Sequence, residues 1–120
     1  MTLEALRTPE ACFTDLPGWD YTPEHVDDLA GYEGLRLAYV DEGPKTGAPV
    51  FLCLHGEPSW GYLYRKMAPV FLKAGARVVI PDLFGFGRSD KPVDDAVYTF
   101  HWHRNALKAF LERMDLRDIC

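Results

Sequence analysis

Two short apolar runs constrain the fold of this chain more than any other feature of its sequence. They occupy residues 50–54 and 77–80, and the first follows a proline while the second precedes one. Runs of this kind suit strands that are buried on both faces, as in a parallel sheet. Between them, residues 61–73 have apolar side chains at helical spacing, and Pro69 should kink or split that helix. The pattern predicts a strand–helix–strand unit with a right-handed crossover.

The rest of the chain extends this α/β pattern. Residues 1–34 are rich in Pro, Gly, Asp and aromatic residues, which predicts an irregular lead-in with at most one short strand. Residues 35–40 should form a strand, 100–114 a helix, and 116–120 a turn that enters a further strand. One face of the helix is apolar and should be buried: Phe100, His103, Leu107, Phe110, Leu111 and Met114. We therefore expect the α/β class, with a mostly parallel sheet flanked by helices.

Composition excludes several classes of partner. The 120 residues are 48% hydrophobic and 26% charged, which suits a globular core, and the net charge of -5 disfavours nucleic acid and anionic membranes. The N-terminus does not resemble a signal peptide, and no apolar run could span a bilayer. Cys12, Cys53 and Cys120 are scattered and odd in number, which favours reduced thiols and a cytoplasmic location. The length is about half of what most single-unit α/β enzymes need.

The first motif with chemical content is His55-Gly56-Glu57-Pro58, directly after the first apolar run. Gly56 permits a tight backbone path at this turn. Backbone N–H groups in such a strand–helix loop can face a developing oxyanion during ester chemistry. The pattern alone is equally compatible with an ordinary turn after a strand.

The second motif is the glycine-rich segment 82–92. It contains G-x-G without a third glycine at dinucleotide-binding spacing, and no helix follows at once, so a nucleotide cofactor is not expected. Asp82 and Asp90 should hold this loop through side chain–backbone hydrogen bonds. His101 and His103 lie two apart on a helix and do not face each other, so we predict no metal site and no cofactor.

Together these segments resemble the haloalkane dehalogenases, a family of α/β-hydrolases. The resemblance is carried by residues 55–67 and 82–92, and also by 29–36 and 98–105. HGxP and GxGxSD are shared with epoxide hydrolases, whereas the longer Glu57-containing string is more specific. Glu57 stands where one dehalogenase branch has Asn, and it resembles the branch whose halide ligands are two tryptophans.

The resemblance implies hydrolysis of a small haloalkane to an alcohol and halide. An Asp carboxylate displaces the halide to form an alkyl-enzyme ester, and a His oriented by a second carboxylate activates water to hydrolyse it. The nucleophile is expected after the strand that begins near Ile119, so nucleophile, acid, base and helical cap all lie outside this chain. Residues 35–120 would then be the first half of the α/β-hydrolase core. The chain alone should be inactive, and the full-length protein monomeric.

Only Glu57 is carried over as a catalytic group, through its backbone N–H as half of the oxyanion hole. The resemblance also implies that the Glu57–Pro58 peptide bond is cis. His55, Gly56 and Pro58 support the loop, and Trp60 should pack beside it rather than bind halide.

Two alternatives remain open at this stage. The chain could belong to an epoxide hydrolase or another α/β-hydrolase, or it could be a free-standing, non-catalytic binding module. The family's strand order, 1-2-4-3-5-6-7-8, makes residues 50–54 the third strand, next to a fifth that this chain barely begins. That strand would become an unprotected edge, which predicts poor solubility, a molten state or self-association.

Overall fold

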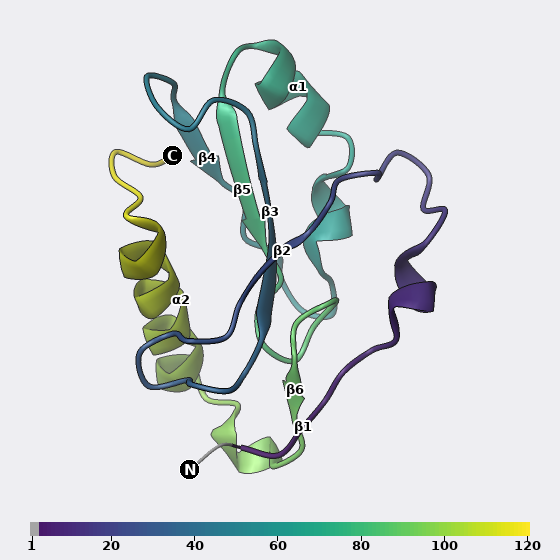
Figure 1. Cartoon of the computed structure of the whole chain (residues 1–120), viewed down its shortest axis with the longest axis vertical. Coiled ribbons are helices and arrows are strands. Elements are labelled where there is room, and N and C mark those ends of the chain that lie inside the picture. The colour runs from purple at the N-terminus through teal and green to yellow at the C-terminus, as the bar shows by residue number, and fades with distance from the viewer. Residues whose placement is uncertain (1–2) are drawn as a thin grey trace.

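The computed structural model describes residues 3–120, and its centre is a four-stranded sheet with the order β2-β3-β5-β4 (Figure 1). The strands span Glu24–Val26 (β2), Leu37–Glu42 (β3), Arg77–Pro81 (β5) and Val50–Leu52 (β4). A separate antiparallel pair joins Ala5–Leu6 (β1) to Lys91–Pro92 (β6). The lead-in therefore contains two short strands, β1 and β2, together with the 3₁₀ turn Glu10–Phe13 (η1). The first two residues of the expected lead-in lie outside the described residues.

The sheet is mixed, so the expectation of a mostly parallel sheet is wrong. Only β4 and β5 pair in parallel, whereas β2–β3 and β3–β5 are antiparallel. A parallel pair needs a crossover connection, and the described residues contain one complete crossover, between β4 and β5. The connection between β2 and β3 (27–36) contains no helix and is too short for such a crossover, so this pair is antiparallel. The α/β class itself is confirmed.

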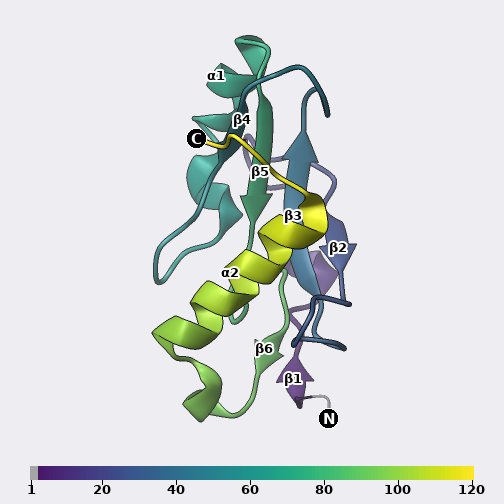
Figure 2. The ribbon, with the colours of Figure 1, turned by 90° about the vertical axis from the view of Figure 1, so that its left-hand side faces the viewer.

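Two helices cover opposite faces of the sheet (Figures 1 and 2). They are Ala68–Lys73 (α1) and Phe100–Met114 (α2). The side chains of β5 alternate between the two resulting cores, as the pleat of a strand requires. Val79 packs with α2 residues such as Phe110, while Val78 and Ile80 pack on the other face with Ala68 of α1.

The helical segment 61–73 is split, as Pro69 predicts. Gly61–Tyr64 forms a 3₁₀ turn (η2), and α1 begins again at Ala68 with the proline in its first turn. Proline is tolerated there because the first N–H groups of a helix have no intrahelical partner.

Helix α2 has the predicted bounds. Thr99 caps its N-terminus by accepting a hydrogen bond from the Trp102 backbone N–H at 3.1 Å, and Asp115 ends it in the left-handed conformation. Its buried face differs in part from the prediction: Ala106 and Phe110 are buried, but Phe100 is 76% exposed. Phe100 is the first residue of the helix and contacts neither core.

The end of the chain pairs with β4 in parallel, through a bridge between Val50 and Ile119. The Leu52 N–H donates to the Cys120 carbonyl and the Cys120 N–H donates to the Val50 carbonyl, both at 2.8 Å. This agrees with the first five positions of the expected strand order and with the entry into a further strand. It also means that the outer edge of β4 is partly covered rather than bare. No helix among residues 3–120 is long and apolar enough to cross a membrane.

Candidate functional site

His55 joins the two loops that follow the parallel strands β4 and β5. Its side chain is buried, its Nε2 atom lies 2.9 Å from the Leu83 backbone nitrogen, and its Nδ1 atom lies 2.9 Å from the Gly56 carbonyl oxygen. A backbone N–H only donates and a carbonyl only accepts, so Nε2 is the acceptor and Nδ1 carries the proton. His55 is thus a neutral imidazole that fixes the loop geometry, and both of its nitrogens are engaged.

Glu57 lies beyond this anchor, on the exposed part of the turn. The Glu57–Pro58 peptide bond is cis, which confirms the expectation from the resemblance. Within residues 3–120, neither the backbone N–H nor the carboxylate of Glu57 has a hydrogen-bond partner. The turn therefore offers a free N–H donor, held beside the anchored His55-Gly56 backbone.

Glu57 is one of the residues that line a hollow of about 310 Å³. Its walls come from the two anchored loops and from the start of α2: His55, Gly56, Glu57, Leu83, Phe86, Phe100 and His103. A second hollow of about 270 Å³ shares Leu83, Phe100 and His103 and is otherwise lined by Leu54, Arg104 and Leu107. The combined surface is mainly apolar with few polar groups, which is typical of a small-molecule site.

His103 is the wall residue that the sequence did not indicate as part of a site. Its Nδ1 atom is buried without a hydrogen-bond partner in the described part of the chain. Burial lowers the pKa of His103, and the proximity of His55 lowers it further. Helical periodicity placed His103, unlike His101, on the buried face of α2, but which loops that face meets depends on how α2 packs against the loop after β5.

Asp82 organises the glycine-rich loop, as predicted. Its carboxylate accepts hydrogen bonds from the backbone N–H groups of Gly61 at 2.7 Å and Arg88 at 3.0 Å. Burial raises the pKa of this carboxyl, and the two N–H donors oppose that shift. Gly87 must be glycine here, because its φ is +54° and a Cβ would lie 2.5 Å from Asp82 Oδ2.

Asp90 ties the end of the loop to a neighbouring segment. Its carboxylate accepts from the Arg36 backbone N–H at 2.9 Å and from the Arg7 guanidinium at 2.7 and 3.0 Å. The predicted side chain–backbone bond is present, but its donor lies outside the loop. The Asp90 carbonyl, not the side chain, accepts from Gly85 inside it.

Trp60 packs behind the loop, as expected, and is absent from the walls of both hollows. Its ring contacts Phe13 at 5.2 Å, Tyr62 at 5.6 Å and Trp19 at 6.1 Å between centroids. Its Cβ also lies 2.8 Å from where a Cβ on Gly87 would sit. Trp60 therefore supports both loops from the side opposite to the hollow.

The described residues supply a donor and a wall, but no nucleophile–base pair. Neither His55 nor His103 is hydrogen-bonded to a carboxylate within residues 3–120. Burial raises the pKa of the Cys53 thiol to about 11, so it remains an unreactive thiol at neutral pH. Across the same residues, no group of three or more His, Cys, Asp or Glu side chains is arranged to hold a metal ion.

Comparison with known proteins gives the family. Residues 49–120 match the model of the alpha/beta hydrolase fold. The chain is 50% identical over 119 residues to a haloalkane dehalogenase of Psychrobacter cryohalolentis and 45% identical over 117 residues to one of Mycobacterium marinum. These alignments cover 98% and 97% of this chain but 39% of each relative, so the chain spans about two fifths of their length.

Solved structures agree with this assignment. The tetrameric haloalkane dehalogenase DpaA from Paraglaciecola agarilytica NO2 is 62% identical, with a TM-score of 0.95 over 98% of this chain and 39% of DpaA. An epoxide hydrolase from Vigna radiata, at 24% identity and a TM-score of 0.69 over 82% of this chain and 30% of its own, shares the fold. The chain therefore belongs to the alpha/beta hydrolase fold family, and within that family it is similar to haloalkane dehalogenases.

Proposed function

We propose that this chain forms the oxyanion-binding half of a hydrolase that cleaves carbon–halogen bonds of small haloalkanes. The observation that carries the proposal is that Glu57, whose backbone N–H has no partner among residues 3–120, lines an apolar hollow of about 310 Å³. An N–H group held in place before the reaction stabilises negative charge without reorganisation, which makes it effective in a site that excludes water. The similarity to haloalkane dehalogenases selects the substrate class.

In this proposal each loop residue has a distinct task. The attacking carboxylate, its base and the acid partner come from residues beyond Cys120. When water attacks the carbonyl carbon of the alkyl-enzyme ester, negative charge develops on the carbonyl oxygen, and the Glu57 N–H donates to that oxygen. His55 holds the loop at the correct distance through its bonds to Leu83 and Gly56. Leu83, Phe86 and Phe100 supply an apolar surface for the substrate's alkyl chain.

The 120-residue chain alone should release no halide. An oxyanion donor without a nucleophile and base has no intermediate to stabilise. The measurement is halide release from 1,2-dichloroethane or 1-bromobutane against a matched blank. Release above the blank would show that the nucleophile lies within residues 1–120 and would overturn this division of roles.

A chimera tests the proposal directly. Residues 1–120 of this chain are joined to the remainder of the Psychrobacter cryohalolentis relative, and halide release is measured beside hydrolysis of styrene oxide and 4-nitrophenyl butyrate. We expect turnover of the haloalkanes. A folded chimera that hydrolyses only the epoxide or only the ester would replace the proposal with an epoxide hydrolase or an esterase. Because DpaA is tetrameric, the assay is run across a range of protein concentrations, and no monomeric state is assumed.

A further inference from the structure

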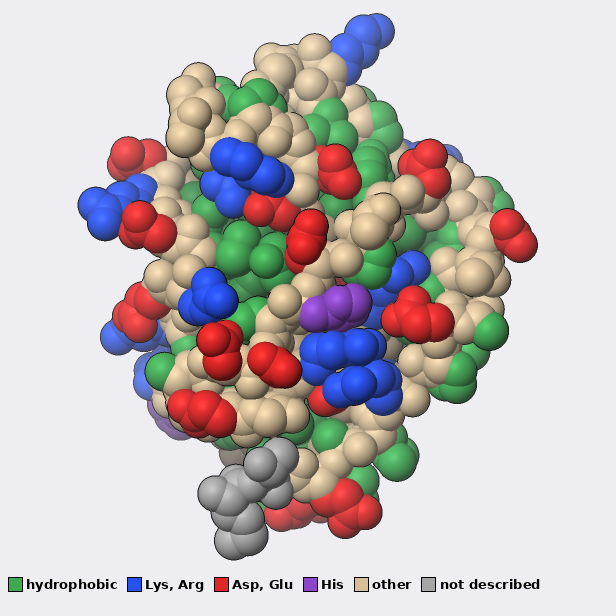
Figure 3. Space-filling view, in the orientation of Figure 1, with side chains coloured by type: hydrophobic (Ala, Val, Ile, Leu, Met, Phe, Trp, Pro, Cys, Tyr) green, Lys and Arg blue, Asp and Glu red, His purple; other side chains and the backbone are tan. Residues whose placement is uncertain are grey.

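Four basic side chains from separate segments meet on the face of the molecule that carries η1 and β2. Arg7 follows β1, His25 lies in β2, Arg36 precedes β3, and Arg88 belongs to the glycine-rich loop. Figure 3 shows basic side chains gathered beside a histidine on this face. We call these three arginines and the histidine beside them the arginine cluster. None of them lines the hollow beside Glu57.

The carboxylates near the arginine cluster do not satisfy it. Asp90 is fully engaged by Arg7, at 2.7 and 3.0 Å, and by a backbone N–H. Glu10 is left as the shared partner of Arg36, at 3.8 Å, and of Arg88, at 3.6 Å, and both distances exceed a hydrogen bond. The Nε atoms of Arg36 and Arg88 are buried and have no partner among the described residues. Two guanidinium groups therefore share one distant carboxylate.

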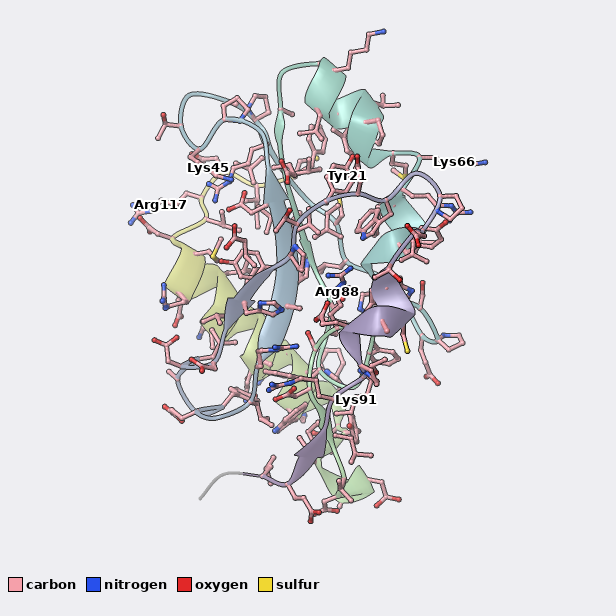
Figure 4. The ribbon with its side chains drawn as sticks, turned by 45° about the vertical axis from the view of Figure 1, so that its right-hand side comes forward. Tyr21, Lys45, Lys66, Arg88, Lys91 and Arg117 are labelled. Carbon is pink, nitrogen blue, oxygen red and sulfur yellow. The ribbon has the colours of Figure 1, made fainter. Side chains whose placement is uncertain are left out.

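The two guanidinium groups are held in place, whereas Glu10 is not. The Arg88 side chain is 11% exposed, lies 4.8 Å above the Phe13 ring and donates to the Phe13 carbonyl at 3.3 Å. Figure 4 shows it between η1 and the strands. The Arg36 side chain is 22% exposed. The Glu10 side chain is 61% exposed on the short turn η1, so it can swing into solvent at little cost.

We propose that Arg36 and Arg88 bind a small oxyanion, of the size and charge of inorganic phosphate, in the place that the Glu10 carboxylate takes in this structure. The two Glu10 oxygens face the two arginines separately, Oε1 toward Arg36 and Oε2 toward Arg88, so a single anion can span both. Phosphate carries more charge than a carboxylate and more acceptor oxygens, and guanidinium groups pair with it at hydrogen-bond distance. The site is independent of the hydrolase activity proposed above.

The surroundings of His25 support an excess of positive potential. Burial lowers the pKa of His25, and Arg36, Arg88 and Arg7 lower it further, while Glu10 acts in the opposite direction. A bound anion would take over the effect of the Glu10 carboxylate at the same position.

Phosphate titration by isothermal calorimetry at low ionic strength tests the site. It is run on the 120-residue chain and on the chimera, so that marginal folding of the short chain cannot hide it. Arg36→Gln should weaken binding about tenfold or more, since a charge-assisted hydrogen bond is lost. Glu10→Gln should tighten binding about fivefold, because the carboxylate that competes with the anion for the two guanidinium groups loses its charge. Glu112→Gln, an exposed substitution with the same charge change on α2, should leave the affinity unchanged.

The outcomes separate a ligand site from a structural ion-pair network. Saturable binding in either protein with opposite effects of the two cluster variants supports the proposal. Absence of saturable binding in both proteins overturns it. It is equally overturned if Glu10→Gln changes phosphate affinity no more than Glu112→Gln, or if equal ionic strength from sodium chloride reproduces the heat signal.

Discussion

Replacement of Gly87 by alanine tests how the glycine-rich loop is held. A Cβ at this position would lie 2.5 Å from Asp82 Oδ2 and 2.8 Å from the Trp60 Cβ. The φ of +54° alone costs a non-glycine residue about 1–2 kcal/mol. Because Trp60 is packed among aromatic rings, the Asp82 carboxylate must move, and it then loses at least one charge-assisted hydrogen bond worth about 1.5–3 kcal/mol. We expect Gly87→Ala to lower the free energy of unfolding by about 3–5 kcal/mol.

Gly18 offers a matched control for the backbone contribution. Its φ is +70°, but a Cβ there would have no atom within 4 Å. Gly18→Ala should therefore cost only the conformational part, about 1–2 kcal/mol. Urea denaturation of the chimera, monitored by circular dichroism, gives both values. If Gly87→Ala costs no more than Gly18→Ala, the Asp82 carboxylate has room to adapt and its proposed role in fixing the loop is wrong.

Three further perturbations test the site, an ion pair and the exposed surface. An amide-to-ester replacement that removes only the residue 57 N–H should lower kcat of the chimera about 10²–10³-fold. Glu57→Ala keeps the N–H, so its kcat should stay within a few-fold of that of the unmodified chimera. Equal losses of kcat in the two variants would refute the oxyanion role. Burial of the Asp41 carboxyl opposes its ionisation, but the hydrogen bonds and charges of Arg77, at 2.8 and 2.9 Å, and of Lys45, at 2.9 Å, together outweigh burial, so its pKa lies below the ordinary value of 3.8. The ionised Asp41 carboxylate contributes to the free energy of unfolding above its unfolded-state pKa, and this contribution is lost as pH falls through the lower folded-state pKa. Asp41→Asn should therefore flatten the decrease in the free energy of unfolding at acid pH, measured by urea melts across pH. An unchanged decrease would contradict this. The isolated chain should self-associate in sedimentation velocity. Phe100→Glu, at a position that is 76% exposed and lines both hollows, should reduce this association more than Val93→Glu, at a position that is 51% exposed. A wild-type chain that sediments only as a monomer would refute this prediction.

Local signals in the sequence predicted local structure well. The bounds of α2 follow from helical periodicity and from Thr99 at its start, and the break before α1 follows from Pro69. These features act within one or two turns of the chain, so their physics can be read from neighbouring residues. Asp82 was predicted for a similar reason, because a carboxylate next to a glycine-rich loop readily bonds backbone N–H groups.

Strand direction and the walls of the site were harder to predict. The direction of β3 relative to β5 depends on residues about 40 positions apart, such as Tyr39 and Pro81, and no local pattern encodes it. The same holds for His55 and Leu83, which meet because β4 and β5 end at the same edge of the sheet. His103 joins them only through the packing of α2: its helical spacing predicted burial, but not which loops it would meet.

The central position of β5 also has a consequence for the growing chain on the ribosome. Both of its neighbours, β3 and β4, are synthesised earlier, and neither pairs with the other. Val78 and Ile80 then complete the apolar cluster on the α1 face, whereas the cluster that holds Val79 still lacks Phe84, Ala106 and Phe110. Until β5 has left the exit tunnel, β3 and β4 therefore lack the strand that lies between them. The nascent chain is thus exposed to aggregation over that interval, and its α1 layer can close before its α2 layer is synthesised.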